Sequence, residues 1–444
     1  MRFACSSACG AIVALLMLPA VSSFGQEDFE NPPISYSASA PHNCVSRLQQ
    51  QLESGEKVLA YEPEHGYLSA LLAELGVPVE SQVLVFSKTS LQLRRISPRT
   101  PRAIYFHDDV YVGFCRQGDV LEISASDPEL GTVFYTIDQQ DSSRARIERH
   151  ADSCLVCHSS SRTDGVPGHL VRSLYVDETG YPVLSGGSRN VNHTTPIEER
   201  WGGWYVTGQH GDQKHLGNLI VKERPGSKPV DNSAGQNVTS LTDRFDVTPY
   251  LSPHSDLIAL MVLEHQALVH NRITSASFTA RQALAYNEMM NEALKNPPET
   301  RLDSTTRRIQ NAGDKLVEAL LMADEAPLTS PMSGTSGFAE SFAQEGPHDQ
   351  KGRSLRELEL QTRMFKYPCS YLIYSDSFTK LPGVMQDYVW KRLWDVLNGT
   401  GNTTKFSHLT SEDRSAILSI LRETHPQVPA SWTADTKVSQ TDRL

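Results

Sequence analysis

The sequence lacks any hydrophobic run long enough to cross a membrane. The apolar stretch Ala11–Leu18 is far shorter than the roughly 18 residues that a transmembrane helix needs. It follows Arg2 and precedes Pro19 and several small residues, which is typical of a secretory signal. We therefore expect residues 1–25 to be a cleaved signal peptide. The mature chain is then periplasmic or secreted, soluble and without a transmembrane segment.

Positive charge is scarce relative to negative charge. The chain has 41 Lys and Arg against 52 Asp and Glu, a net charge of −11, and removing residues 1–25 takes away one charge, Arg2, which leaves −12. Because such a chain repels phosphates, a nucleic-acid partner is not expected. Apolar residues make up 39% and charged residues 21%, a composition that places the chain outside the disordered class.

Cysteines are few, and only two of them stand close together. Beyond residue 25 there are five, at Cys44, Cys115, Cys154, Cys157 and Cys369. Exported proteins usually pair their thiols, but Cys154 and Cys157 belong to one tight motif. Of the other three, we expect a disulfide between Cys44 and Cys115 and a free thiol at Cys369.

The first part of the chain has the pattern of an antiparallel sheet. Helical spacing over residues 43–75 ends at Gly76, and short segments rich in β-branched and aromatic residues then alternate with Gly, Pro and Asp. The turn signal Asp108-Asp109 favours a hairpin over a cation site. The expected strands are Val83–Phe86, Ala103–Cys115, Val120–Ser124 and Thr132–Ile137. Further strands are expected on both sides of the turn at 177–180 and at 201–206.

From residue 251 onward the apolar spacing is mainly helical. We expect one helix to start at Ser252-Pro253 and to continue to about Leu294, because serine caps helices and proline suits their first turn. Residues 327–352 are rich in Ser, Gly and Pro and are expected to form a loop. The other expected helices cover 303–323, 383–397 and 411–423, the last opened by the capping pattern Thr410-x-x-Asp413.

The motif that carries chemistry is Cys154-Leu155-Val156-Cys157-His158. C-x-x-C-H is the attachment signature of c-type haem: two thiols on one helical turn bind the porphyrin, and the histidine lies under the iron. A structural zinc site would need a fourth ligand and usually a second paired cluster, and the sequence has no second C-x-x-C. A disulfide redox centre would be expected in a small βαβ domain.

At this motif the chain resembles the c-type cytochromes. The resemblance implies one covalent haem c, thioether bonds at Cys154 and Cys157, and His158 as the proximal iron ligand. It also implies that a proline carbonyl downstream accepts the other imidazole N–H, and Pro167 is the best match. Such a bond would fix the tautomer of the ligand. A plain turn at residues 165–168 is the alternative.

A second resemblance covers about 60 residues at the C-terminus. Phe365-Lys366-Tyr367-Pro368, the helix through Trp390 and the segment Leu409–Asp413 are similar to the closing part of bacterial cytochrome c peroxidases. Those enzymes carry two haem motifs, whereas this chain has one. The resemblance therefore does not imply their two-haem mechanism.

The sixth iron ligand separates an electron carrier from a haem enzyme. His265 is the first candidate, because it shares a helical line with Ile258, Val262 and Val269; a hydrogen-bonded core histidine is the alternative. Further candidates are Met332, Met364, His193, His210 and His215, and an iron without a distal ligand is also possible. Among the aromatic residues, Trp201, Trp204 and Tyr205 are candidates to pack against the porphyrin.

Together these patterns predict an α+β fold: an antiparallel β-rich N-terminal part and a helical, cytochrome c-like haem region with large insertions. The expected divisions are 26–150, with the strands; 151–250, with the haem segment and hairpins; and 251–444, mainly helical and closing over the haem. We expect electron transfer with a six-coordinate iron and a redox partner protein, for which the acidic net charge favours a basic surface. A haem-dependent oxidoreductase, peroxidase-like or oxidase-like with an open distal site, is the alternative.

Overall fold

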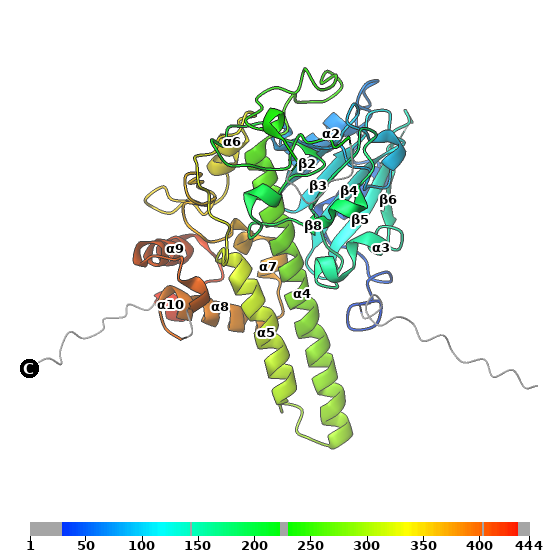
Figure 1. Ribbon diagram of the computed structural model, residues 1–444. Coiled ribbons are helices and arrows are strands. Elements are labelled where there is room, and N and C mark those ends of the chain that lie inside the picture. The colour runs from blue at the N-terminus through cyan, green and yellow to red at the C-terminus, as the bar shows by residue number, and fades with distance from the viewer. Residues whose placement is uncertain (1–28, 143, 223–229, 402–403, 434–444) are drawn as a thin grey trace, which may run out of the picture.

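The structure is a computed structural model that describes residues 29–142, 144–222, 230–401 and 404–433. The expected signal peptide lies outside the described residues. The fold is α+β, as predicted: an antiparallel sheet forms in the N-terminal half and helices dominate the C-terminal half (Figure 1). None of the described helices combines the length and the apolar character that crossing a bilayer would require.

The main sheet has seven antiparallel strands in the order β6-β5-β4-β3-β2-β1-β9. Its central hairpin turns at Asp108-Asp109, as the sequence predicts. A separate two-stranded sheet pairs β7 with β8. The strand expected directly after the turn at 177–180 is wrong: only an isolated bridge between Val176 and Pro182 spans that turn, and β7 pairs with residues 188–190 instead. The strands are β1 Val83–Val85, β2 Arg102–His107, β3 Val110–Phe114, β4 Val120–Asp127, β5 Gly131–Asp138, β6 Ile147–His150, β7 Arg172–Leu174, β8 Ser188–Asn190 and β9 Trp204–Tyr205.

Alternation along the strands gives the sheet two buried faces. Tyr105 and Val112 point to the face covered by α1 (Cys44–Ser54) and α2 (Leu68–Leu75). Phe106 and Tyr111 point to the opposite face, where they join the core built around the long helix α4 (Leu257–Leu294). Sequence segments far apart therefore meet on the second face.

Helix α4 begins later than the sequence predicts. Asp256, not Ser252, is its N-cap: the Asp256 carboxylate accepts hydrogen bonds from the backbone N–H groups of Ile258 and Ala259. The other Asp256 oxygen accepts from Thr335 and Ser336, which ties the helix start to a distant loop. The helix therefore starts after Asp256 and not at Ser252-Pro253, because Asp256 is also held by the loop at residues 335 and 336.

Helices pack on the side of α4 that faces away from the sheet. Helix α5 (Asp303–Leu320) pairs with α4, their joined ends project beyond the rest of the molecule, and α8 (Gly383–Leu397) packs against α5 (Figure 1). The expected loop 327–352 contains one short helix, α6 (Phe338–Gln344). The remaining helices are α3 Leu155–His158, α7 Asp376–Thr379, α9 Ser411–Thr424 and α10 Ala430–Thr433.

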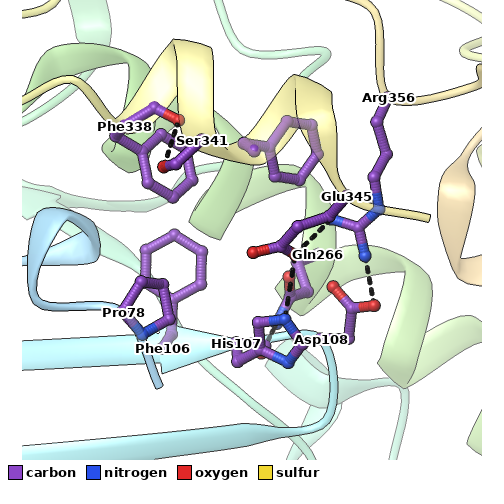
Figure 2. A pocket seen from close by; sticks show the side chains of 10 residues that line it. Pro78, Phe106, His107, Asp108, Gln266, Phe338, Ser341, Glu345 and Arg356 are labelled. Carbon is purple, nitrogen blue, oxygen red and sulfur yellow. Dashed lines mark hydrogen bonds and ion pairs between the residues drawn. The ribbon is translucent and has the colours of Figure 1, made fainter. Parts of the chain in front are cut away.

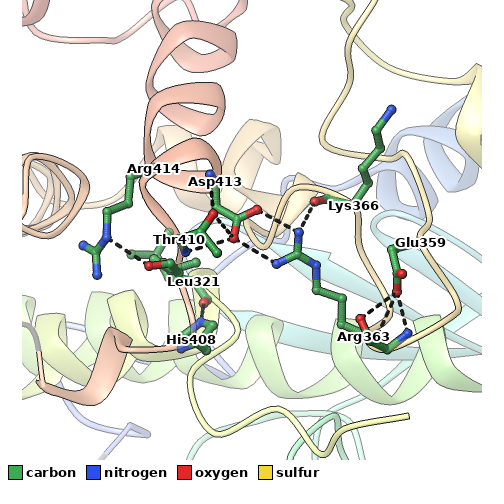
Figure 3. Close-up of polar contacts among 10 residues, drawn as sticks. Leu321, Glu359, Arg363, Lys366, His408, Thr410, Asp413 and Arg414 are labelled. Carbon is green, nitrogen blue, oxygen red and sulfur yellow. Dashed lines mark hydrogen bonds and ion pairs between the residues drawn. The ribbon is translucent and has the colours of Figure 1, made fainter. Parts of the chain in front are cut away.

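The predicted capping box at the start of α9 is confirmed. The Thr410 hydroxyl accepts from the backbone N–H of Asp413, and the Asp413 carboxylate accepts from the N–H of Thr410. The Asp413 carboxylate also accepts hydrogen bonds from Arg363, whose two terminal guanidinium nitrogens lie 2.7 and 3.0 Å from the two carboxylate oxygens (Figure 3). The cap therefore also anchors the 359–366 segment to the last long helix.

The expected disulfide between Cys44 and Cys115 is wrong, because both thiols are free. Cys44, at the start of α1, lies close enough to Asp109 to feel its charge. Cys115 directly follows β3 and is six residues beyond Asp109. At 3.3 Å per residue along an extended strand, Cys115 lies about 20 Å from Asp109. Cys369 is free, as expected, and it is also buried.

Buried histidines predict that acid destabilises this fold. Burial lowers the pKa of His193 to about 3 and that of His270 to about 4. Because both folded pKa values lie below the unfolded value of about 6.5, the unfolded chain binds protons more readily, and stability is lost as pH falls from about 6.5 towards 4. Each imidazole accounts for about 1.4 kcal/mol per pH unit.

Urea unfolding at pH 7.5 and 5.0 measures this loss. His270→Gln should reduce the difference between the two pH values, whereas the exposed His42→Gln should not. A pH difference in His270→Gln as large as that of the wild type would contradict the prediction.

Candidate functional site

A cavity of about 880 Å³ lies between the second face of the sheet and the segment that carries the C-x-x-C-H motif. Its floor includes Ile104, Gly113 and Phe134 from β2, β3 and β5, and α4 adds Leu263 and Ala267. Two further segments, residues 87–93 and 182–184, border its opening. No other helix of the described C-terminal region lines it, so the expectation that this region closes over the site holds only for α4.

The motif forms a single helical turn against this cavity. Cys154 is the N-cap of α3, and its carbonyl accepts from the backbone N–H groups of Cys157 and His158 at 3.3 and 3.0 Å. Cys154 is half-buried, Cys157 is exposed, and both thiols are free. The two thiols and the imidazole all line the cavity. The structure thus brings together the three residues that the sequence singled out.

The His158 ring is held by a backbone carbonyl. Its Nδ1 lies 2.9 Å from the carbonyl oxygen of Gly168, so an N–H at Nδ1 donates to Gly168 and leaves the Nε2 lone pair for a metal. Burial lowers the pKa of His158, which favours the neutral, ligating form. The prediction that the Pro167 carbonyl is the acceptor is wrong, because the next residue, Gly168, takes that role. The Pro167 carbonyl accepts from the backbone N–H of Thr132.

Helix α4 fixes the position of the Gly168 carbonyl, which binds His158. The Asn271 side chain accepts from the N–H of His169 and donates to its carbonyl, both at 2.9 Å. Gly168 allows this approach, since a Cβ there would lie 2.3 Å from Asn271 Oδ1. The N–H of Gly168 in turn donates to the carbonyl of His158 at 2.8 Å. Asn271 therefore positions His158 through two intermediate residues.

The cavity fits a haem in size and in chemistry. Its volume falls within the range of cofactor pockets, about 300 to 1,000 Å³. Ile104, Phe134, Trp204 and Leu263 give it apolar walls that suit a porphyrin. Of the three candidate aromatic residues, Trp204 lines the cavity and donates from Nε1 to the Arg172 carbonyl, whereas Trp201 and Tyr205 are core residues. Two thiols and one imidazole are the donor set of c-type attachment.

His265 does not lie at this cavity, which contradicts its assignment as the distal ligand. Its Nδ1 lies 3.0 Å from Nδ1 of His193, and its Nε2 lies 2.8 Å from the Ser370 hydroxyl. Both ring nitrogens are therefore engaged within the core beside α4. The apolar spacing of the helix identified a buried face, but that face packs against residues 193 and 370 instead of a cofactor.

The other distal candidates are also absent from the lining residues that the structure describes. Met332 and Met364 are buried core side chains. His210 and His215 form their own pair, with their Nε2 atoms 3.1 Å apart. These methionines and histidines need no cofactor to explain them.

Sequence reasoning missed the polar residues of the floor. His169 faces the cavity, with Nε2 3.1 Å from the Ser124 hydroxyl and its ring 4.0 Å from that of Tyr111. Arg102 forms an ion pair of 2.6 Å with Glu122 and passes over Gly113, where a Cβ would clash with the guanidinium. Arg102 on β2 and Glu122 on β4 share one face of the sheet, whereas His169 comes from the loop between α3 and β7, so only the tertiary fold brings the three together.

A second polar cluster lies at the opposite end of the β2–β3 hairpin (Figure 2). Ligand atoms of His107, Asp108 and Glu345 lie within 4.8 Å of one another, a spacing that suits a metal ion. Arg356 however pairs with both Asp108 and Glu345. Its guanidinium already supplies the positive charge, so the cluster is balanced as an ion-pair network beside the turn. Burial raises the pKa of the neighbouring Asp109 to about 7.

The Asn271 contact yields a prediction about stability. Asn271→Ala removes two buried hydrogen bonds to His169, and at about 1 kcal/mol each the unfolding free energy should fall by about 2 kcal/mol. Ser275→Ala, on the same helix and half-buried, is the matched control and should change it little. Urea titration measures both variants. Equal losses in the two would show that Asn271 is not a special anchor.

In comparisons with known proteins, no family model, curated protein or solved structure matches this chain.

Proposed function

We propose that this chain is an exported mono-haem c-type cytochrome that transfers electrons through one covalently bound haem. The observation that carries the proposal is the convergence of Cys154, Cys157 and His158 on one cavity of cofactor size. The hydrogen bond from His158 Nδ1 to Gly168 supports it further, because that bond leaves Nε2 for the iron.

In this proposal the chain's own residues have separate roles. Cys154 and Cys157 would hold the porphyrin covalently, and His158 would ligate the iron. Ile104, Phe134 and Trp204 would surround the porphyrin with apolar side chains and keep water away from it. Haem bound in this way supplies one-electron chemistry at the iron.

A second candidate, a haem-dependent oxidoreductase with an open distal site, is favoured by one observation. Among the described residues that line the cavity there is no methionine, and the only imidazole besides His158 is His169. Both ring nitrogens of His169 lie near hydroxyl groups, at 3.1 Å from Ser124 and 3.2 Å from Thr132. An iron with an exchangeable sixth position suits binding of a small molecule.

Covalent attachment is tested by mass. After expression with export and haem maturation, the intact mass should exceed that of the polypeptide from about residue 26 by one haem, and the colour should survive boiling in denaturant. Cys157→Ala should lose at least one of the two links, whereas Cys44→Ser should keep both. Release of all colour from the denatured wild type, or zinc as the bound metal, would refute the proposal.

The distal face is tested by absorption spectra and carbon monoxide. The proposed electron carrier predicts a six-coordinate, low-spin ferric spectrum, whereas the open distal site of the second candidate predicts a high-spin ferric spectrum and carbon monoxide binding to the ferrous form within seconds. Because none of the expected distal ligands lines the cavity, the spectrum decides between the two. His265→Ala should lower stability but leave the haem spectrum unchanged. A low-spin wild-type spectrum without carbon monoxide binding would support a two-ligand electron carrier, and His169→Ala would then identify the ligand.

A further inference from the structure

The opening of the cavity is bordered by exposed apolar side chains. Leu91 is 61% exposed, Val156 70% and Leu184 78%, and all three line the cavity. They come from three separate segments, so the fold gathers them. Large apolar side chains that gather on a surface mark interaction sites. We call the surface formed by Leu91, Val156, Leu184 and the cations described next the cavity rim.

The charges at this cavity are mostly positive, although the protein is acidic. Glu122 is the only acidic residue among the described lining residues, and Arg102 neutralises it. Lys88, Arg162 and Arg172 remain, and none of these three forms an ion pair within the described parts of the chain. A chain with a net charge of −11 thus presents three uncompensated cations around one opening.

Structural contacts hold two of these cations at the rim. Arg172 donates from Nη2 to the Ser188 hydroxyl at 2.7 Å, across the β7–β8 pair. Arg162 and Arg172 line the same cavity, and burial, followed by the charge of Arg162, lowers the pKa of Arg172. The Lys88 ammonium lies 4.7 Å from the centroid of the Tyr181 ring. Like charges held close together without an acid between them favour an anionic partner.

We infer that the cavity rim is the docking surface for the acidic face of a redox protein that exchanges one electron with the haem. The inference rests on the proposed electron-transfer function. Net charge alone suggests a basic partner, but a partner meets the local potential at the site of electron exchange. The apolar side chains exclude water from the contact, and the surrounding cations orient an acidic face over the opening.

Small inorganic oxidants first separate local charge from net charge. In each reaction one electron passes from the ferrous protein to the oxidant: ferricyanide becomes ferrocyanide, and hexaammineruthenium(III) becomes hexaammineruthenium(II). If the rim attracts anions, the ferricyanide rate constant should fall about five- to tenfold between roughly 10 and 150 mM ionic strength, because salt screens the attraction. The hexaammineruthenium(III) rate constant should rise or stay level. The opposite pair of slopes would overturn the inference.

Charge-reversal variants locate the attraction. Arg162→Glu and Arg172→Glu should each slow the ferricyanide reaction about two- to fivefold at low ionic strength, and together they should reverse its salt dependence. Arg307→Glu, an exposed site on α5 with the same change in charge, is the matched control and should have little effect. Equal effects of all three variants would attribute the attraction to net charge and overturn the inference.

Binding of a polyanion tests the docking surface without using electron transfer. Fluorescein-labelled poly-L-glutamate should bind the wild type at low ionic strength, measured by fluorescence anisotropy, and slow its reaction with ferricyanide. Both effects should weaken in Arg162→Glu and in Leu184→Ser, whereas poly-L-lysine should not slow the reaction. If poly-L-glutamate fails to bind while ferricyanide is still attracted, the rim is a site for small anions, and the protein-docking inference fails.

The two proposals fail in distinguishable ways. A purified protein without covalent haem would refute the proposed function, whatever its response to polyanions. A protein with covalent haem but with repulsion of ferricyanide would refute only the docking surface.

Discussion

Burial of the first eleven residues of helix α4 on all sides is the constraint on which the rest of the structure depends. Every residue from Leu257 to Ala267 is buried, although this stretch includes Glu264, His265 and Gln266. Buried polar groups need partners, because leaving one unpaired costs about 1 to 3 kcal/mol. The neighbouring segments must therefore approach α4 in one specific arrangement, and this arrangement unites the sheet with the C-terminal helices.

Each polar residue on this stretch reaches a different segment. Glu264 pairs with Arg200 at 2.9 Å, His265 lies between His193 and Ser370, and Gln266 donates to Tyr111 on the sheet. One turn further along, Asn271 holds the backbone that orients His158. The same helix thus ties the core together and aligns the attachment turn. Both ring nitrogens of His265 bind partners in the core, so His265 has no nitrogen left to ligate an iron.

Charge is distributed unevenly over this molecule, and for a partner at the cavity the local charge matters more than the net charge. The acidic excess lies elsewhere, whereas the described residues that line the cavity include four cations and one acid. A haem contributes two carboxylates of its own, so some positive charge at the cavity also suits the cofactor. Two haem carboxylates against three rim cations leave an excess of one positive charge, which lies beside the exposed side chains of Leu91, Val156 and Leu184 and favours a role in recognition.

The sequence by itself determined the local features of this protein. The C-x-x-C-H turn, most strands of the main sheet, the end of α2 and the capped start of α9 follow from patterns within a few residues, because helical turns, caps and alternation are short-range. The sequence also placed Cys154, Cys157 and His158 together, since one turn of helix is enough to do so. These predictions needed no knowledge of how the chain folds back on itself.

Only the tertiary structure decided what surrounds that turn. The start of α4 at Asp256, the acceptor Gly168 in place of Pro167, and the free thiols of Cys44 and Cys115 all depend on segments far apart in sequence. So do the grouping of His169, Arg102 and Glu122 on the floor and the cations at the rim. Spacing along the chain reports which face a residue occupies. Strand order and helix packing decide which segment covers that face, and no local pattern encodes that choice.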